Sequence, residues 1–495
     1  MLHSDKRRFL KMAEKAKKPC AIALHKEVTL DKTPLECYEA LYSEGESYIL
    51  ESVEKEKRHA RFSFVGVSPS AIISADGGMK LEALDDAGER LFAMASPYLK
   101  CTDAFNALSS LFRSIEHHSS IHFDRHVFVG GLIGYIAYDA ALRWENIKSR
   151  HEKKDDFKFM FSPSTILFDH LENKTYILFN ALITPDISPE EAYADAVENI
   201  KRIEARMNVK SAHAPKVSVD TPHSNTSKDE YEDMVRKAKE HIYDGDIFQV
   251  VLSRRYEFDG ESDALQVYKR LRDVNPSPYM YCVQFGDGAI IGASPETLVT
   301  VHGRRVITNP IAGTRGRGAT REEDERLAEE MRYDPKEVAE HIMLVDLGRN
   351  DVAKVSKPGS VVVDDYMSVL KYSHVQHLES TVTGILKDEC SMFDAIRAIF
   401  PAGTVSGAPK IRAMEIIDEL EKDARDVYAG GLGYFSFNGD ADFAIIIRTI
   451  VKEANKLHIQ AGAGIVADSV PENEYYETEK KMGAMLRAIE TLEGV

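Results

Sequence analysis

Residues 306–318 read Val-Ile-Thr-Asn-Pro-Ile-Ala-Gly-Thr-Arg-Gly-Arg-Gly. The β-prone run 306–308 stops at Asn309-Pro310, and three glycines and two arginines then surround a threonine. Glycine permits the backbone angles that aim several N–H groups at one point, so such a segment can hold an anion. The pattern predicts a strand that leads into an anion-binding loop.

The composition indicates a large acidic protein. Its 495 residues exceed what one hydrophobic core usually serves, which favours two domains. The formal charge of −17, from 63 basic and 80 acidic residues, argues against nucleic-acid or anionic-membrane binding. The five cysteines are scattered without a C-x-x-C pair, as in a reducing compartment. Since no apolar run reaches about 18 residues, we expect a cytoplasmic protein with no nucleic-acid or membrane partner.

The chain divides into two units joined by a linker. We expect residues 1–209 to form an N-terminal regulatory domain and residues 228–495 a C-terminal catalytic domain. Residues 210–227 are rich in Ser, Pro, His, Thr and Asn and lack periodicity, as is typical of a linker. Capping boxes predict helix starts at Ser188–Glu191, Ser227–Glu230 and Ser469–Glu472.

Hairpins with glycine turns recur in the second unit. Pairs of β-prone runs flank short turns within residues 281–293, 298–308 and 433–449, where the last run covers 443–449. Hairpins imply antiparallel sheets, so the intervening helices should pack outside them. These helices are expected at 320–331, 335–347, 409–422 and 471–492. The predicted fold class is α+β, with antiparallel sheets packed as a sandwich and helices outside.

Two glycine motifs are better explained by local structure than by nucleotide binding. Residues 462–467 match the dinucleotide fingerprint G-x-G-x-x-A, but no helix opens on the glycines. Residues 403–410 resemble a phosphate loop but lack its spacing, and they suit a turn before a helix with Pro409 in its first turn.

Three acidic residues are candidate metal ligands. Glu340 interrupts the apolar helical run 338–345, where a charge is rarely buried unless it is paired or ligates a metal. Glu474 and Glu477 share one face of the last helix. The helix dipole also explains acids in a first turn, and for these two alone that explanation is favoured. Carboxylates without a nearby Cys or His cluster suit Mg²⁺ rather than Zn²⁺.

A series of short motifs runs through residues 228–492 in a fixed order. They are Gly292–Glu296, Pro310–Arg315, Ala339–Asp351, Val375–His377, Phe400–Thr404, Gly430–Phe435, Ile447-Arg448 and Ala461–Gly464. By these motifs the chain resembles the chorismate-utilising enzymes, and among them most strongly the anthranilate synthase large subunits (component I). The first half is more divergent but resembles their regulatory domain at Leu50-Glu51-Ser52 and Arg61–Gly66.

The resemblance implies a role for each matching position. Glu340 and Glu477 would bind Mg²⁺ with Glu474 in support, His377 is the active-site histidine, and Glu296 is the acid near the departing hydroxyl. The implied chorismate-binding groups are Gly313, Thr314, Tyr428, Arg448, Gly462, Ala463 and Gly464. Chorismate carries two carboxylates, which a metal, an arginine and aimed N–H groups can bind. Its ring hydroxyl is a poor leaving group and needs a proton donor.

Ala312 discriminates within the family. Similar aminodeoxychorismate synthases carry lysine at this position as a covalent nucleophile, and the isochorismate and salicylate enzymes depend on a lysine base. Alanine supplies neither group, whereas ammonia is already a nucleophile and needs only room. The resemblance therefore implies conversion of chorismate and ammonia to anthranilate and pyruvate, the first step of tryptophan biosynthesis. The alternatives are an aminodeoxychorismate synthase-like enzyme and a catalytically dead tryptophan sensor.

A partner and an inhibitor are also implied. The chain shows no segment with a candidate glutaminase cysteine, so a separate glutamine amidotransferase subunit (component II) would supply ammonia within a heterotetramer. Feedback inhibition by L-tryptophan is implied by two segments from opposite halves of the chain, because an indole and an amino-acid head need an apolar slot with a few polar groups. The expected contacts are Leu50, Ser52, Asn275, Pro278, Tyr279 and Met280.

Overall fold

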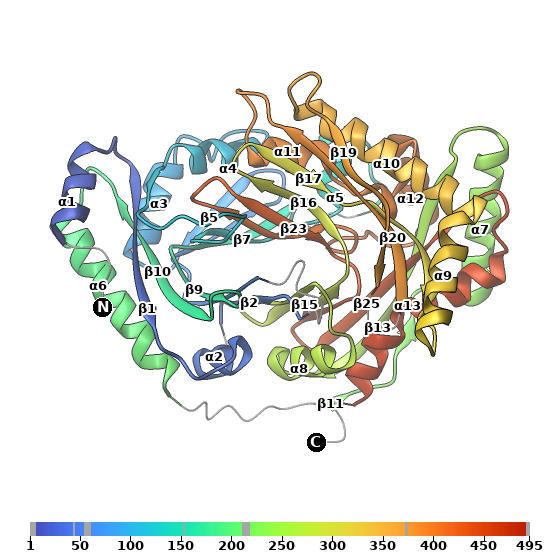
Figure 1. Cartoon of the computed structure of the whole chain (residues 1–495), viewed down its shortest axis with the longest axis horizontal. Coiled ribbons are helices and arrows are strands. Elements are labelled where there is room, and N and C mark those ends of the chain that lie inside the picture. The colour runs from blue at the N-terminus through green and yellow to red at the C-terminus, as the bar shows by residue number, and fades with distance from the viewer. Residues whose placement is uncertain are drawn as a thin grey trace.

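The computed structural model describes residues 6–42, 45–53, 61–151, 154–209, 218–371 and 375–491. Two large β-sheets lie face to face in the middle of the molecule, and helices surround them (Figure 1). In the described part, no helix is both long enough and apolar enough to span a bilayer.

The first sheet contains 14 of the described strands. They are β1 Cys20–Val28, β2 Ser47–Glu51, β3 Phe62–Val67, β6 Glu116–His118, β9 Ser164–Asp169, β10 Lys174–Ile183, β11 Ser218–Val219, β12 His223–Ser224, β13 Gln249–Glu261, β14 Tyr279–Phe285, β15 Gly288–Ser294, β21 Gly407–Ala408, β24 Thr449–Glu453 and β25 Lys456–Ile465. The main order is β11-β13-β25-β24-β15-β14-β2-β3-β9-β10-β1-β6, with β12 and β21 also paired to β13. The pairings are antiparallel except that of β1 with β6.

The second sheet contains 11 of the described strands. They are β4 Ala71–Ala75, β5 Met79–Ala83, β7 Gly131–Ile136, β8 Phe157–Ser162, β16 Thr297–His302, β17 Arg305–Thr308, β18 Ile311–Gly316, β19 Val362–Lys371, β20 Val375–Ile385, β22 Gly431–Ser436 and β23 Ala441–Ile445. The order is β18-β20-β17-β16-β23-β22-β7-β8-β4-β5, with β19 on β20, and all pairings are antiparallel. The predicted α+β class with packed antiparallel sheets is confirmed.

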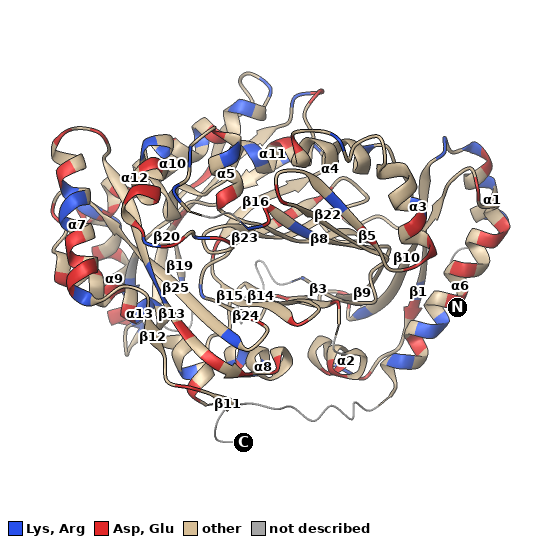
Figure 2. Cartoon of the chain, turned by 180° about the vertical axis from the view of Figure 1, so that it is seen from behind, with Lys and Arg blue, Asp and Glu red and all other residues tan. Residues whose placement is uncertain are grey.

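Helices cover the outer faces of both sheets (Figure 1). They are α1 Lys6–Lys15, α2 Pro34–Leu41, α3 Asp86–Ala95, α4 Ala104–Arg113, α5 Asp139–Trp144, α6 Pro189–Met207, α7 Lys228–Tyr243, α8 Ala264–Val274, α9 Arg321–Tyr333, α10 Pro335–Val355, α11 Met392–Ile399, α12 Lys410–Leu420 and α13 Pro471–Glu490, with a short 3₁₀ turn at Gly403–Val405. Charged residues are frequent on the outer helices, for example α6 and α7, whereas most residues of the sheets between them are uncharged (Figure 2).

Strand β3 shows how one segment serves two cores. Successive side chains of a strand point to opposite faces. Phe62 and Phe64 belong to the core between the sheets, and Val65 and Val67 to the core beneath the helices. The Phe64 ring lies 5.7 Å, centroid to centroid, from the Tyr434 ring of β22 in the opposite sheet. These aromatic contacts join the two sheets into one sandwich.

Two of the three predicted capping boxes form. Ser188 caps α6 and Ser227 caps α7, each with the glutamate three residues later completing the box. The third prediction is wrong: α13 begins after Val470 without a side-chain cap. The Ser469 hydroxyl instead accepts a hydrogen bond from the Val466 N–H at 3.1 Å, because the chain turns back at this point from β25.

The predicted strand 443–449 is divided between the two sheets. Its first part is β23 in the second sheet, and Thr449 starts β24 in the first. Arg448, between them, has φ = 54°, a left-handed conformation that costs energy for a residue with a Cβ. The change of sheet therefore happens at a residue predicted to bind substrate.

The segment expected to be an anion-binding loop is a strand. Ile311–Gly316 forms β18, paired with β20 through a bulge between Ala312 and Arg315. Gly313 has φ = 67° within this bulge, so glycine does serve a left-handed position here. Arg315 binds Asp334 and Glu337, and Arg317 binds Asp324, so both arginines tie the strand to helices.

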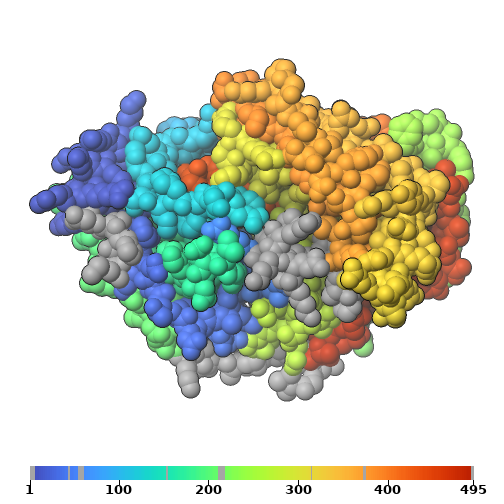
Figure 3. Space-filling view, viewed as in Figure 1, coloured from blue at the N-terminus to red at the C-terminus, as the bar shows by residue number. Residues whose placement is uncertain are grey.

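Each sheet takes strands from both sides of the predicted linker. In the first sheet β2 pairs with β14, and in the second β7 pairs with β22. Segments from the beginning, middle and end of the chain also lie side by side on the surface (Figure 3). Residues 210–217 of the predicted linker lie outside the described residues, and β11 and β12 follow them. The division into domains 1–209 and 228–495 stays a prediction.

Candidate functional site

A cavity of about 230 Å³ opens where the edges of the two sheets meet. Its walls come from β13, β18, β20, β25 and α10, with the turn before β16 and the segment before β22. Nine predicted site residues line it, namely Glu296, Ala312, Gly313, Glu340, His377, Tyr428, Arg448, Gly462 and Gly464. Segments up to 168 positions apart in sequence thus meet in one place.

Glu296 is a buried carboxyl in the turn between β15 and β16. Its pKa is raised to about 7, chiefly by burial and to a small extent by Glu379, while the Thr404 hydrogen bond and the Lys481 ammonium oppose the rise. The Thr404 hydroxyl donates to Oε1 at 2.8 Å. At neutral pH a large fraction of Glu296 is therefore protonated, as a general acid requires.

His377 lies on β20 opposite the bulge of β18. Its Nδ1 lies 2.7 Å from the Gly313 carbonyl oxygen, and since a carbonyl only accepts, Nδ1 carries the proton. Burial lowers the pKa of His377, the Gly313 contact raises it, and the positive charge of Arg448 lowers it. The ring is thus neutral near pH 7, with Nε2 as its basic nitrogen.

Ala312 lies buried on β18 and leaves space in the cavity wall. It pairs with Leu378, the neighbour of His377, so the two predicted catalytic positions are adjacent in the sheet. A Cβ on Gly313 would meet Glu337 Oε2 at 3.1 Å and Met331 Sδ at 3.3 Å, which makes the bulge sterically tight. Thr314 belongs to the same strand, but its side chain lies outside the described part.

Tyr428, Arg448 and Gly462 make a polar corner of the cavity. The Gly462 N–H bonds to the Tyr428 hydroxyl, whose pKa burial raises to about 12. The Arg448 guanidinium donates to the Lys481 carbonyl, and the Lys481 ammonium donates to the Gly462 carbonyl at 2.9 Å. Two cations and backbone N–H groups in one corner can bind carboxylates. Ala463 is not among the lining residues, because its side chain points into the core.

Of the three acids predicted to bind metal, Glu340 lines the cavity. Glu474 and Glu477 are not among the lining residues and lie on α13, the helix that carries the lining residue Lys481. Burial and, after it, repulsion from Glu337 raise the pKa of Glu340. Burial also raises the pKa of Glu474, opposed by the Ser469 hydrogen bond and reinforced by repulsion from Glu477. Among the described residues, no three His, Cys, Asp or Glu side chains stand close enough together to form a metal-binding group.

The oxygen atoms present nevertheless suit a cation such as Mg²⁺ that takes only a few of its ligands from the protein. Gln249 donates to Glu340 at 3.3 Å, and its Oε1 is buried without a hydrogen-bond partner beside the same cavity. Lys481 lies 3.4 Å from Glu477 and partly offsets its charge. Carboxylate and amide oxygens are ligands that Mg²⁺ accepts, usually with several waters and substrate oxygens completing its shell.

Sequence reasoning did not predict every lining residue. Among those it missed, Gln249, Thr404 and Lys481 contact predicted site residues through their side chains. Thr404 ends a recognised motif, and Lys481 stands four residues after Glu477, on the same face of α13. Helical spacing could have indicated Lys481, but nothing local marks Gln249, which reaches the cavity from the first residue of β13.

A second cavity, of about 280 Å³, lies between the sheets. It is lined by Leu50, Ser52, Pro278, Tyr279 and Met280, which are predicted inhibitor contacts, and by aromatic residues such as Phe62 and Phe64. Strands β2 and β14 bring them together, since Met280 pairs with Glu51. The Ser52 hydroxyl is buried without a partner. Asn275 ends α8 and is not among the lining residues.

Comparison with known proteins shows the family to which this chain belongs. A family model described as chorismate binding enzyme matches residues 45–487. Anthranilate synthase component 1 from Haloferax volcanii is 43% identical over 99% of this chain and 98% of its own. The protein of that name from Thermococcus kodakarensis is 44% identical over 92% and 97%. The crystal structure of anthranilate synthase component I from Streptococcus pneumoniae superposes with a TM-score of 0.74 at 34% identity, covering 98% of both chains.

Proposed function

Because this chain belongs to the chorismate binding enzyme family, we propose that it is the large subunit of an anthranilate synthase. It converts chorismate and ammonia to anthranilate, pyruvate and water. The observation that carries the proposal is the pairing of a buried acid, Glu296, with a small residue, Ala312, in the cavity wall. The acid can assist a hydroxyl to leave, and the alanine leaves room for ammonia where a lysine would compete.

The residues of the cavity divide the reaction between them. Arg448 and Lys481 bind the carboxylates of chorismate, and the N–H groups of β25 fix its orientation. Glu296 gives its proton to the ring hydroxyl, which departs as water while ammonia forms the new C–N bond. His377 Nε2 then takes a ring proton, the enolpyruvyl group leaves as pyruvate, and the ring becomes aromatic.

Magnesium is the proposed cofactor. Glu340 and Glu477 would hold it with support from Glu474, and the orphaned Gln249 Oε1 lies beside the same space. When bound, the cation neutralises substrate carboxylate charge and helps to orient chorismate. The raised pKa values of Glu340 and Glu474 support the assignment, because burial is the main cause of both shifts and a bound cation would offset the cost of burying these charged carboxylates.

A separate glutamine amidotransferase subunit is the proposed source of ammonia. The name component 1 of the relatives implies a second component. In the described part of this chain, the strands and helices all belong to the two-sheet sandwich, and none is left over to form a glutaminase domain. The second cavity is the proposed tryptophan site, because it combines apolar and aromatic walls with the unpartnered Ser52 hydroxyl.

One assay tests the activity. The purified chain is incubated with chorismate, Mg²⁺ and ammonium, and anthranilate is followed by its fluorescence. We expect anthranilate with ammonium and none with glutamine, until an amidotransferase subunit is added. A product that retains the enolpyruvyl group would identify an aminodeoxychorismate synthase-like enzyme. Chorismate or tryptophan binding without any turnover would identify a sensor on a dead scaffold.

A further inference from the structure

A buried ion pair lies behind the wall of the chorismate cavity. Arg425, which is 2% exposed, follows α12 and donates from Nε and Nη2 to the two carboxylate oxygens of Glu421, at 2.9 and 2.6 Å. Neither residue is among those that line the cavity. The pair therefore cannot touch a substrate in the cavity, and it can affect catalysis only by positioning the lining residues to which it is bonded.

Arg425 binds two backbone carbonyls of the wall. Its Nη1 donates to the Val405 oxygen and its Nη2 to the Val251 oxygen, both at 2.7 Å, and both of these residues line the cavity. Val405 directly follows Thr404, whose hydroxyl donates to Glu296. Arg425 is thus connected to Glu296 through Val405, which it bonds, and Thr404, the preceding residue.

The same guanidinium lies over two aromatic rings. Its central carbon is 4.7 Å from the ring centre of Tyr138 and 5.6 Å from that of Tyr428. Tyr428 lines the cavity and meets the N–H of Gly462. A planar cation over a ring restricts the position of that ring.

Glu421 extends the contacts, through β13, to strand β25. Its Oε1 accepts hydrogen bonds from the Ser253 N–H at 2.7 Å and from the Ser253 hydroxyl at 2.8 Å. The Ser253 oxygen in turn accepts from Nε2 of Gln460, at 2.8 Å, and Gln460 lines the cavity. One ion pair therefore reaches β13, β25, the 3₁₀ turn and the segment before β22.

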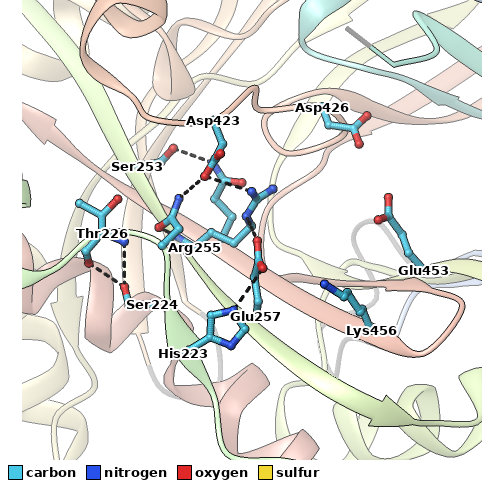
Figure 4. A network of polar contacts seen from close by, with 12 residues as sticks. His223, Ser224, Thr226, Ser253, Arg255, Glu257, Asp423, Asp426, Glu453 and Lys456 are labelled. Carbon is cyan, nitrogen blue, oxygen red and sulfur yellow. Dashed lines mark hydrogen bonds and ion pairs between the residues drawn. The ribbon is translucent and has the colours of Figure 1, made fainter. Parts of the chain in front are cut away.

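A separate network secures this segment from the outside. Arg255 lies between Glu257 and Asp423, at 3.0 and 3.1 Å (Figure 4). Lys154 lies 3.2 Å from Asp426. None of these five residues is among those lining the chorismate cavity. Arg255 is thus a matched control for Arg425: it anchors the same segment but not the cavity wall.

We propose that the Glu421–Arg425 pair is a positioning clamp for the catalytic cavity. It keeps Thr404 against Glu296 and fixes the Tyr428 hydroxyl beside Gly462. Arginine suits this place because its rigid, planar fork serves the carboxylate and two carbonyls at once and also stacks on rings. A lysine has three donors on a flexible stem and cannot keep all of these contacts.

The test compares Arg425→Lys with Arg255→Lys, and it rests on the proposed function because it follows anthranilate formation. We expect kcat to fall about 10- to 100-fold in Arg425→Lys, since small misplacements of reacting groups have effects of that size. Arg255→Lys should stay within about twofold of the parent. Both variants are checked by circular dichroism and thermal unfolding. Glu421→Gln, which keeps the shape but not the charge, should resemble Arg425→Lys and replaces it if that variant does not fold.

The pH profile separates positioning from a general structural effect. Thr404 lowers the pKa of Glu296, so a displaced Thr404 should move the high-pH limb of kcat upward, while Lys481 and Glu379, the charged groups that also act on Glu296, are unchanged. A folded Arg425→Lys with parental kcat and pH profile would overturn the proposal. So would an equal loss in both lysine variants with an unchanged profile.

Chorismate binding separates this inference from the proposed function. If the parent binds chorismate but forms no anthranilate, the proposed function fails, and the clamp is then judged by calorimetry of chorismate binding. Binding at least tenfold weaker in Arg425→Lys, but parental in Arg255→Lys, would still support the clamp. Parental binding in both variants would refute it.

Discussion

The Thr404 hydroxyl donates a 2.8 Å hydrogen bond to Oε1 of Glu296, which joins the 3₁₀ turn to the strand turn that carries the buried acid. These residues are 108 positions apart. The bond orients the carboxyl and also opposes the rise of its pKa. The balance of burial, Thr404 and Lys481 leaves the pKa at about 7, so the group titrates where the enzyme works.

Glu296→Gln tests the acid directly. Glutamine keeps the size and can still accept from Thr404, but it cannot give a proton, so we expect kcat to fall about 10²- to 10⁴-fold. The dissociation constant of chorismate, measured by calorimetry, should change only a few-fold. In the parent, kcat should decline above about pH 7 as Glu296 loses its proton. A parental rate or a flat profile up to pH 9 would remove the assignment.

Glu340→Gln and Glu477→Gln test the metal assignment. Each removes one proposed ligand charge, and we expect Mg²⁺ affinity measured by calorimetry to fall at least about tenfold while the fold survives. Glu472→Gln is the control, because Glu472 lies in the first turn of the same helix but pairs with Lys228 on the surface. Equal Mg²⁺ binding in all three variants would place the metal elsewhere.

Ala312→Lys tests why the cavity wall is small at this point. The lysine amine would enter the space proposed for ammonia, so we expect the ammonia-dependent rate to fall at least about 100-fold, with some substrate carried as an adduct visible in the mass of the quenched protein. Ala319→Lys adds the same group to an exposed position of the same segment and should be nearly silent. Unchanged kinetics in a folded Ala312→Lys would place this residue away from the reacting carbon.

Ser52→Ala and Met280→Thr test the second cavity. Both side chains line it. The Ser52 hydroxyl is buried without a hydrogen-bond partner, and a bound ligand could supply one. We expect tryptophan inhibition to weaken about 5- to 150-fold, the usual range of coupling between sites, with little change in the uninhibited rate. Asn275→Ala should have a smaller effect, because Asn275 is not among the lining residues. If the inhibition curves of all three variants overlay that of the parent, tryptophan does not bind in this cavity.

The burial of His117 predicts that the folded protein becomes less stable in acid. The pKa of His117 is lowered to about 4, chiefly by burial and in part by His118 and His122, while the Asn180 contact opposes the shift. The unfolded chain binds a proton from about pH 6.5 downward, but the folded chain does so only near pH 4. The free energy of unfolding should therefore drop by up to about 3 kcal/mol between those values. His117→Gln should flatten that part of the urea-unfolding curve against pH; an unchanged slope would contradict the assignment.

Local rules predicted much of the secondary structure. The capping boxes at Ser188 and Ser227, and the hairpins around glycine turns, act over three to five residues, so they can be recognised in the sequence alone. The same rules failed at Ser469, where the chain turns out of β25 and the hydroxyl bonds to that turn instead. Tertiary context overrode the local signal there.

Most of the predicted residues that line the first cavity could be found because family motifs mark them, although they are spread from Glu296 to Gly464. Their motifs do not tell where side chains point. Ala463 lies between two lining glycines yet faces the core, because successive side chains of β25 alternate. Gln249 carries no local signal, since its partner Glu340 is 91 positions away. The spacing of Glu421 and Arg425 is local, but it does not reveal that Arg425 also holds the Val251 carbonyl, 174 positions away.

The sequence by itself determined the α+β class, most helices and the motif residues, because these depend on short-range periodicity and capping. Only the tertiary structure decided that residues 311–316 form a strand and that residues 443–449 divide between two sheets at Arg448. A strand exists through the hydrogen bonds of its neighbour, and here the neighbour of β18 lies about 60 residues further along the chain. Sheet partnership is non-local, so it is fixed only when the whole chain packs.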